Sequence, residues 1–245
     1  MKDLFSNHSE EYARYRPNYP RTLFEFVIKL CKDKEIAWDC GTGNGQVADH
    51  LSNYFHKIEA TDISENQLEN AIARPNINYS KQRAEITNFP DHLFDLITVA
   101  QAIHWFDFEG FYKEVNRTAK KDAFILILGY GLLKTSSETD NVINKLYRNI
   151  LDNYWEPERK YLDEEYRTIP FPFEEIRVPN FQNEQFWSFE QIWGYLQTWS
   201  AVRKYIQINQ EDPLDLIKSE LKKAWGKNSM KVEFPLLIRL GRIKK

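Results

Sequence analysis

Three glycines alternate with other residues in the segment 39–45, which reads DCGTGNG. The apolar residues 36–38 before it predict a buried strand, and residues 46–54 after it predict a helix. Glycine lets the backbone turn sharply and lets a ligand approach without a Cβ in the way. Free amide groups at a helix start favour an anionic or hydrogen-bond-accepting ligand. The segment therefore favours folds that bind a ligand between a strand and a helix.

An acidic residue follows the next predicted strand as well. KIEAT at 57–61 predicts a strand that ends at Asp62, 23 residues after Asp39. In open α/β sheets, ligands bind beyond the carboxyl ends of the strands, where an acid can accept hydrogen bonds from both hydroxyls of a ribose. The glycine segment and the two acids together predict a nucleoside-containing cofactor.

The spacing of the glycines bears on which nucleoside cofactor is bound. A dinucleotide site uses G-x-G-x-x-G to hold a pyrophosphate, whereas Gly41, Gly43 and Gly45 give G-x-G-x-G. The carboxylate of Asp39 would also lie poorly beside a pyrophosphate, and it suits the cationic amino and sulfonium end of S-adenosylmethionine better. A tight turn that binds no ligand is the alternative for this pattern.

Predicted strands and helices alternate through the first half of the chain, which indicates βαβ units and a mostly parallel sheet covered on both faces. The 245 residues suit one domain, 1–245. We expect residues 1–130 to form a doubly wound α/β cofactor-binding core and 131–245 to form a helical and aromatic cap and the closing strands. The predicted strands are 36–38, 57–61, 77–79, 94–100, 123–128 and 234–243, and the predicted helices are 8–16, 21–31, 46–54, 108–117, 135–165 and 189–205. Another helix is expected to begin after Ser64 as its N-terminal cap, with Gln67 at its third position as in a capping box.

Composition narrows the function classes. The net charge of −3 and the pI of about 6.0 do not suggest a basic nucleic-acid-binding surface, so no nucleic-acid partner is expected. The N-terminal MKDLFSNHSEEYARYR has no apolar core of a signal peptide, and no apolar run of membrane-spanning length occurs. Cys31 and Cys40 cannot build a zinc site or a Cys-x-x-Cys pair. We expect a cytoplasmic protein without a structural metal.

Several segments resemble the class I methyltransferase superfamily, and more narrowly its small-molecule branch of trans-aconitate methyltransferase-like (methyltransferase type 11) proteins. The resemblance is specific over 1–130 and weak beyond 131. It implies a Rossmann-like, seven-stranded sheet whose last strand is antiparallel, and methyl transfer from S-adenosylmethionine. The segments that carry it are FSNHSEEYARYRPNYP, AWDCGTGNGQVA, IEATDIS, RAEITNFP, DLITVAQAIHWFD and, in the second half, TWSAVRKY.

The resemblance also implies roles for individual residues. The glycine loop would face the methionine and ribose portions, with Asp39 holding the methionine amino group and Asp62 the ribose hydroxyls. Ile63 would pack on the adenine, and Glu85 would lie near its exocyclic amine. The implied cofactor-binding residues are Asp39, Gly41, Thr42, Gly43, Gly45, Asp62, Ile63, Ala84, Glu85 and Gln101. Cys40 departs from the usual small or apolar residue, and we expect it to be a buried bystander.

Methyl transfer from an activated sulfonium requires mainly positioning and exclusion of water, with a general base only when the acceptor must lose a proton. His104 is a candidate base; alternatively it hydrogen-bonds an acidic substrate or packs the loop with Trp105. Arg16 can pair with a carboxylate or form a structural salt bridge. The expected substrate-binding residues are Tyr12, Arg16, Tyr19, His104 and Trp105.

The divergent second half contains five aromatic residues that either cap an organic substrate or belong to the core. They are Trp155, Trp187, Trp193, Tyr195 and Trp199. The sequence predicts an S-adenosylmethionine-dependent enzyme that methylates a small molecule such as a carboxylic acid. AQAIHWF follows the fourth strand in place of the acid- or Asn-led proline motif of base N-methyltransferases. The alternatives are a tRNA or protein methyltransferase, a dinucleotide oxidoreductase and a non-catalytic binder.

Overall fold

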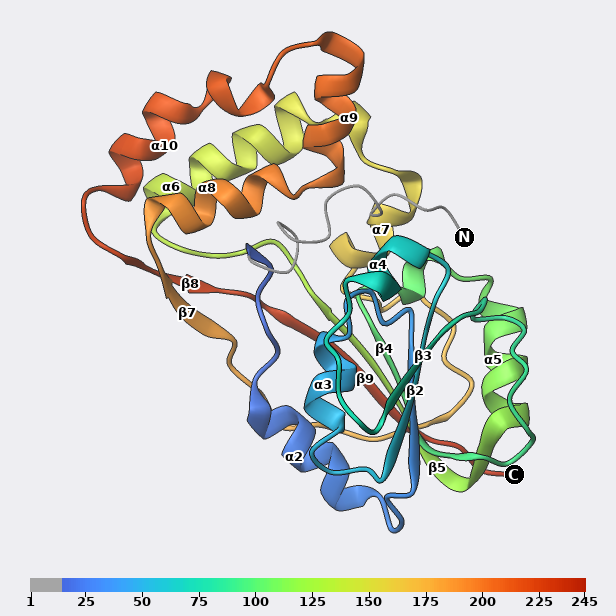
Figure 1. The fold of residues 1–245 in the computed structure, drawn as a ribbon. Coiled ribbons are helices and arrows are strands. Elements are labelled where there is room, and N and C mark those ends of the chain that lie inside the picture. Colours follow the sequence, from blue (N-terminus) through green and yellow to red (C-terminus); the bar gives the residue numbers. More distant parts are fainter. Residues whose placement is uncertain (1–14) are drawn as a thin grey trace.

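The computed structural model describes residues 15–245. Seven strands form one sheet in the order β3-β2-β1-β4-β5-β9-β6 (Figure 1). The strands from β3 to β5 are parallel, and β9 is antiparallel to both of its neighbours. This confirms the expected seven-stranded, mostly parallel sheet. The strands are β1 (Ile36–Cys40), β2 (Lys57–Asp62), β3 (Ile77–Lys81), β4 (Phe94–Ala100), β5 (Ala119–Tyr130), β6 (Glu174–Glu175) and β9 (Leu236–Arg242).

Helices cover both faces of the sheet because its central strands are apolar on both sides. Along β5, Leu126 and Leu128 pack into one hydrophobic cluster with α2 (Arg21–Leu30) and α3 (Gln46–Leu51). Ile127 points the other way, into a second cluster that contains residues of α5 (Phe108–Thr118). The alternation of side chains along the strand thus separates the two layers, as expected for a doubly wound fold.

The loop after β2 enters the short helix α4 (Glu65–Glu69) through the predicted cap. Ser64 Oγ accepts a hydrogen bond from the Gln67 backbone amide at 3.3 Å. A serine in this position satisfies an amide that has no partner within the helix. This N-terminal cap of α4 fixes the direction of the chain directly after Asp62.

The helices of the second half gather at one end of the molecule, where α6, α8, α9 and α10 lie together (Figure 1). Their buried side chains form a third hydrophobic cluster with Tyr130, the last residue of β5, and Phe234, which lies between β8 and β9. The elements are α6 (Ser137–Asn144), a π-helical segment (Lys145–Ile150), α7 (Lys160–Asp163), α8 (Phe189–Gln197), α9 (Ser200–Asn209), α10 (Lys218–Trp225) and the antiparallel pair β7 (Glu184–Trp187) and β8 (Met230–Glu233).

The second half also departs from the expected elements. The helix predicted over 189–205 is two helices, because Trp199 adopts an extended backbone at φ −69° and ψ 130° and buries its indole. The helical stretch 135–165 is divided by π-helical and 3₁₀ turns. The pair of β7 and β8 was not expected. The helix predicted over 8–16 falls almost wholly outside the described residues.

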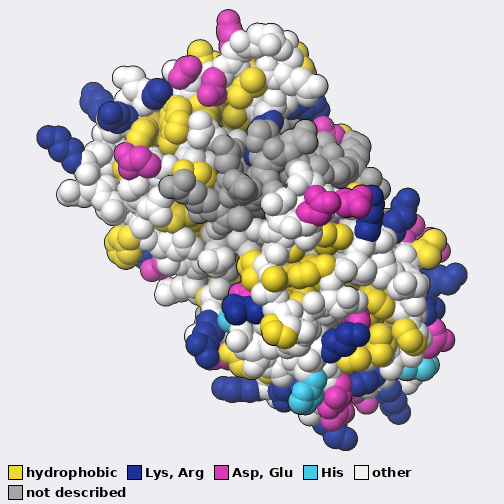
Figure 2. Space-filling view, viewed as in Figure 1, with side chains coloured by type: hydrophobic (Ala, Val, Ile, Leu, Met, Phe, Trp, Pro, Cys, Tyr) yellow, Lys and Arg dark blue, Asp and Glu magenta, His cyan; other side chains and the backbone are white. Residues whose placement is uncertain are grey.

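Within residues 15–245, no helix is both long and apolar enough to cross a membrane. On the part of one face that the described residues form, basic and acidic side chains alternate (Figure 2). Neither charge forms a continuous field there.

Candidate active site

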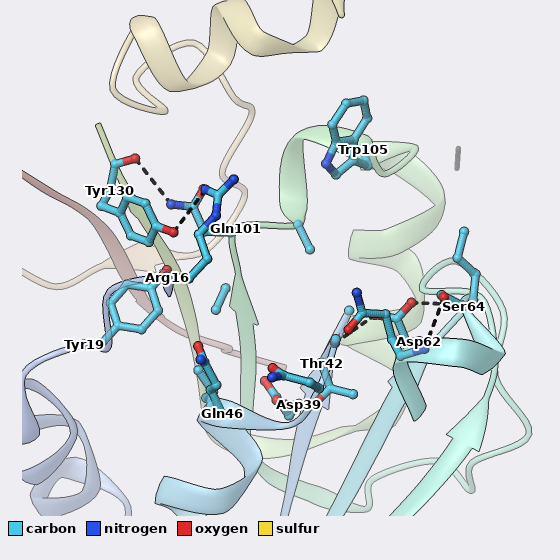
Figure 3. Close-up of a pocket in the computed structure, with 18 of the residues that line it drawn as sticks. Arg16, Tyr19, Asp39, Thr42, Gln46, Asp62, Ser64, Gln101, Trp105 and Tyr130 are labelled. Carbon is cyan, nitrogen blue, oxygen red and sulfur yellow. Dashed lines mark hydrogen bonds between the residues drawn. The ribbon is translucent and has the colours of Figure 1, made fainter. Parts of the chain in front are cut away.

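A cavity lies at the carboxyl ends of β1, β2 and β4, the position where open α/β sheets bind ligands. Asp62 and Ser64 lie at one end of it; Arg16, Tyr130 and Gln101 lie at the other (Figure 3). Ten of the residues predicted for the site line this cavity: Arg16, Tyr19, Asp39, Gly41, Thr42, Gly43, Asp62, Ile63, Gln101 and Trp105.

The glycine loop after β1 has backbone dihedral angles that residues with a side chain rarely adopt. Gly41 and Gly43 have φ values of +67° and +55°. A Cβ on Gly41 would lie 2.7 Å from the Cβ of Ala102, so glycine is required there by both conformation and space. The loop is held toward β2 by the Thr42 amide, which donates to the Thr61 carbonyl at 2.9 Å.

Asp39, at the base of the loop, is fully buried and organises it. Its carboxylate accepts hydrogen bonds from Thr42 Oγ1 at 2.6 Å, Thr98 Oγ1 at 2.7 Å and the Ala48 amide at 3.1 Å. Burial raises the pKa of Asp39 to about 6, because desolvation outweighs these hydrogen bonds. A cation in the cavity would favour the charged form of this carboxylate.

Asp62 joins the two loops that end β1 and β2. Its Oδ2 accepts from the Gly43 amide and its Oδ1 from the Ser64 amide, each at 2.9 Å. Asp62 lines the cavity and is only partly buried. Its carboxylate is therefore held in one orientation at the position expected for a ribose-binding acid.

Three of the residues implied for the cofactor do not line the cavity. Gly45 begins α3 with φ +84°, and a Cβ there would lie 2.1 Å from the Tyr79 hydroxyl, so this glycine serves the packing of the loop on β3. Ala84 is buried in a hydrophobic cluster. Glu85 accepts a hydrogen bond from the Asp107 amide at 3.2 Å. Adenine contacts by Ala84 and Glu85 stay a prediction.

Gln101 lies where this first cavity meets a second, smaller cavity, and it lines both. Its φ of +53° is unusual for a residue with a side chain. Its amide donates to the Leu128 carbonyl at 2.9 Å, and its side chain Nε2 donates to the Tyr130 carbonyl at 3.3 Å. Residues other than glycine with a left-handed backbone conformation occur often at functional sites. These two hydrogen bonds fix Gln101 at the boundary of the two cavities.

His104 lines the second cavity and does not line the first. Its ring is buried, and Nδ1 lies 3.1 Å from the Tyr166 hydroxyl. Desolvation, with a smaller contribution from the charge of Arg159, lowers the pKa of His104 to about 3. A pKa this low makes the imidazole a weak proton acceptor, which disfavours the role of general base. The ring also packs beside Trp105, with centroids 4.9 Å apart, in line with the packing alternative.

Arg16 and Trp105 border both cavities. Arg16 donates to the Tyr130 hydroxyl at 3.3 Å and to the Thr198 carbonyl at 3.2 Å, and it lies over the Tyr195 ring at 5.2 Å. Arg16 thus connects the first half of the chain to the cap. Tyr12, also expected at this site, lies outside the described residues.

The five aromatic residues of the cap divide between the two alternatives. Trp155 and Trp199 line the second cavity, while Trp199 also belongs to the buried hydrophobic cluster of the second half and Trp155 packs against it. Trp187 and Tyr195 are buried in the hydrophobic cluster of the cap, and Trp193 packs against it. Cys40 is buried and its pKa is raised well above the ordinary value by desolvation, as expected for an inert thiol.

Sequence reasoning missed part of the lining. Ser64 and Gln67 belong to the α4 cap, whose pattern was visible, and Tyr130 ends the most apolar strand. The missed lining residues are Pro17, Asn44, Gln46, Val47, Ser64, Gln67, Ala100, Ala102 and Tyr130. Within residues 15–245, no cluster of three or more His, Cys, Asp or Glu side chains could hold a metal ion.

Comparisons with known proteins agree with this geometry. Residues 38–127, which contain the glycine loop and Asp62, match the methyltransferase domain family. A Dictyostelium discoideum protein named as a methyltransferase is 34% identical over 98% of this chain and 95% of its own length. The chain belongs to the class I S-adenosylmethionine-dependent methyltransferases. This identification accounts for the sheet with its antiparallel strand β9 and for the ligand site beyond β1 and β2.

Solved structures show how far the likeness of this methyltransferase extends. A protein from Anaeromyxobacter dehalogenans described as a type II methyltransferase is 38% identical, with a TM-score of 0.86 over 94% of this chain and 99% of that chain. The YcgJ protein of Bacillus subtilis shares 17% identity with a TM-score of 0.54, over 92% of this chain and 100% of that chain, and shows the fold alone. Neither is named for trans-aconitate, so that narrower branch stays a prediction.

Proposed function

We propose that this methyltransferase binds S-adenosylmethionine in the first cavity, called the donor cavity from here on, and methylates a small organic acid. The observation that carries the proposal is that the two ends of the cavity carry different polar side chains. Asp62, suited to a ribose, lies at one end, and Arg16 and Gln101 lie at the other, beside the second cavity. With the ribose at Asp62, Arg16 and Gln101 would lie beside the methyl group of a bound cofactor, where the two cavities meet.

The residues present suit each part of the cofactor. Asp62 is oriented to accept hydrogen bonds from ribose hydroxyls, and Ile63 offers an apolar surface to the adenine. The oxygens of Asp39 already accept three hydrogen bonds from the protein, so its charge would act on the cationic amino acid portion through water. Gly41 and Gly43 leave room for the ligand above the loop.

A carboxylic acid as acceptor fits the groups beside the donor cavity. When bound, S-adenosylmethionine supplies an activated methyl group, and an ionised acceptor oxygen takes it as the carbon–sulfur bond breaks. A carboxylate is already ionised near pH 7, so no protein group has to remove a proton. The low pKa of His104 agrees with such an acceptor. Arg16 supplies the positive charge that would orient it.

The test is transfer of radiolabelled methyl from S-adenosylmethionine to a panel of small organic acids, with tRNA and mixed protein in parallel reactions. We expect label in an acid, released as volatile methanol at alkaline pH because methyl esters hydrolyse there. Asp62→Ala serves as the inactive control. Label only in tRNA or protein would refute the small-acid proposal. Binding of S-adenosylhomocysteine without transfer to any acceptor would favour a non-catalytic binder.

A further inference from the structure

The second cavity lies between the loop after β4 and the cap, and it shares Arg16, Gln101 and Trp105 with the donor cavity. We propose that this cavity is the acceptor subsite and that Arg159 is the residue that anchors a carboxylate of the acceptor in it. The inference rests on the proposed function, because the cavity receives a methyl group only if the cofactor occupies the donor cavity.

Arg159 is held rigidly by aromatic neighbours. Its guanidinium lies over the ring of Trp155 at 4.8 Å and over the ring of Tyr147 at 5.1 Å. Its Nε donates to the Tyr147 hydroxyl at 2.7 Å, and that hydroxyl donates to Asp163 Oδ1 at 2.6 Å. Stacking on aromatic faces is a common means of fixing a guanidinium. Arg159 is therefore positioned before any ligand binds.

The part of Arg159 that remains available suits an anion. Within the part of the chain that the structure describes, neither Nη1 nor Nη2 has a hydrogen-bond partner, and the side chain is 24% exposed. A planar pair of donors matches the two oxygens of a carboxylate. The geometry provides one bidentate position for an acid that enters the cavity.

The charges around the cavity also favour an anionic ligand. Arg16 and Arg159 both line it together with Glu156, which accepts from Lys204 Nζ at 2.8 Å. The Asp163 carboxylate lies 3.9 Å from Arg159 Nε but does not line the cavity. His104 adds no charge, because burial lowers its pKa. The balance is positive in a partly enclosed site, where a charge is screened less than at the surface.

Aromatic walls indicate the shape of the rest of the acceptor. Trp155 and Trp199 line the cavity with ring centroids 5.5 Å apart, and Trp105 lines both this cavity and the donor cavity. Flat apolar walls with few polar groups are typical of sites for small organic ligands. The expected acceptor is therefore a compact acid with an apolar or unsaturated body.

The π-helical segment Lys145–Ile150 explains how the anchor is placed. Isolated π-helical turns occur often at functional sites. Here the turn includes Tyr147, whose ring contacts Trp155 and Trp199 at 4.8 and 5.7 Å between centroids. Tyr147 carbonyl oxygen also accepts from Trp155 Nε1 at 3.0 Å. Tyr147 is thus a positioning residue for both Arg159 and Trp155.

The experiment measures binding of carboxylates to protein saturated with S-adenosylhomocysteine. The probes are benzoate and succinate, with benzamide and succinamide as neutral counterparts, detected by ligand-observed NMR titration. Arg159→Gln removes the anchor. Arg148→Gln is the matched control, because Arg148 also lies over the Tyr147 ring, at 6.0 Å, but is exposed and does not line the cavity. Arg159→Lys and Tyr147→Phe are milder changes to the same anchor, so they test it even if Arg159→Gln does not fold.

We expect at least one carboxylate to bind the wild type, with its amide bound at least tenfold more weakly. Arg159→Gln should weaken the acid about 10- to 100-fold, Tyr147→Phe should weaken it a few-fold, and Arg148→Gln should leave it unchanged. Affinity for S-adenosylhomocysteine should be equal in all folded variants. Equal binding of acids and amides, no carboxylate binding, or no effect of Arg159→Gln and Arg159→Lys would overturn the subsite. Failure of S-adenosylhomocysteine to bind the wild type would overturn the proposed function itself.

Discussion

Asp62 accepts a hydrogen bond from the Gly43 amide at 2.9 Å, so the acid that follows β2 is joined directly to the glycine loop that follows β1. The same carboxylate accepts from the Ser64 amide. Two loops that are distant in sequence therefore present their ligand-binding groups as one unit. This unit has consequences for cofactor affinity that substitutions can measure.

Replacing Asp62 by alanine should lower the affinity for S-adenosylhomocysteine by about 10- to 100-fold, because a hydrogen bond to a charged group contributes about 1.5–3 kcal/mol. Isothermal titration calorimetry measures the change. Glu65→Gln is the matched control, since Glu65 is exposed and pairs with Lys81 on the surface. Equal affinity of Asp62→Ala and wild type would remove Asp62 from the cofactor site.

Cofactor affinity should depend on the ionisation of Asp39. Burial raises the pKa of this carboxyl to about 6, so Asp39 contributes to folding stability at acid pH, and that contribution is lost as the pH rises through about 6. A ligand ammonium group favours the ionised form. Affinity for S-adenosylhomocysteine should therefore rise by several-fold, up to about tenfold, between pH 5 and 7.5. Asp39→Asn should show a flat profile, and the same slope in both proteins would contradict this assignment.

Gly45 should tolerate substitution less well than Gly43, although both have positive φ. Alanine at position 45 meets the Tyr79 hydroxyl at 2.1 Å, whereas at position 43 the nearest atom is 3.9 Å away. We expect Gly45→Ala to lower the free energy of unfolding by about 2–4 kcal/mol and Gly43→Ala by about 1–2 kcal/mol. Urea denaturation measures both. If the two variants are equally stable, the contact with Tyr79 does not restrict position 45.

His104→Gln should retain kcat within about tenfold of wild type once an acceptor is in hand. A lost general base would cost about 10²–10⁴-fold, but the pKa of His104 is lowered to about 3, which makes its ring a weak proton acceptor near pH 7. Steady-state kinetics across pH 5–8 should show no inflection that disappears with the histidine. A kcat reduced a thousandfold, with such an inflection in the wild type, would restore the base role.

The fold of the first half was predictable because its signals are local. Apolar runs such as Phe94–Ala100, the glycine loop and the Ser64 cap each depend on adjacent residues. The fold of the second half was not predictable, because the positions where its helices end and its strands pair depend on tertiary packing. Trp199 ends a helix by burying its indole, and β7 pairs with β8 across more than 40 residues of sequence. The one-domain organisation over 1–245 and the cytoplasmic location stay predictions.

The residues of the site also divide into those that were predictable from the sequence and those that were not. The residues that follow β1 and β2 were identifiable from a spacing pattern. Arg159 was not, because its role depends on Tyr147 and Trp155, which reach it only through the folded cap. A single arginine in a charged stretch resembles a solvated surface residue until its neighbours in space are known.

The most direct measurement is calorimetric titration of the wild-type protein with S-adenosylhomocysteine, with NAD in a parallel experiment. Asp62 and the glycine loop predict one tight site for S-adenosylhomocysteine per chain and no binding of NAD. Correctly folded protein that binds NAD, or that fails to bind S-adenosylhomocysteine, would contradict the assignment of the donor cavity.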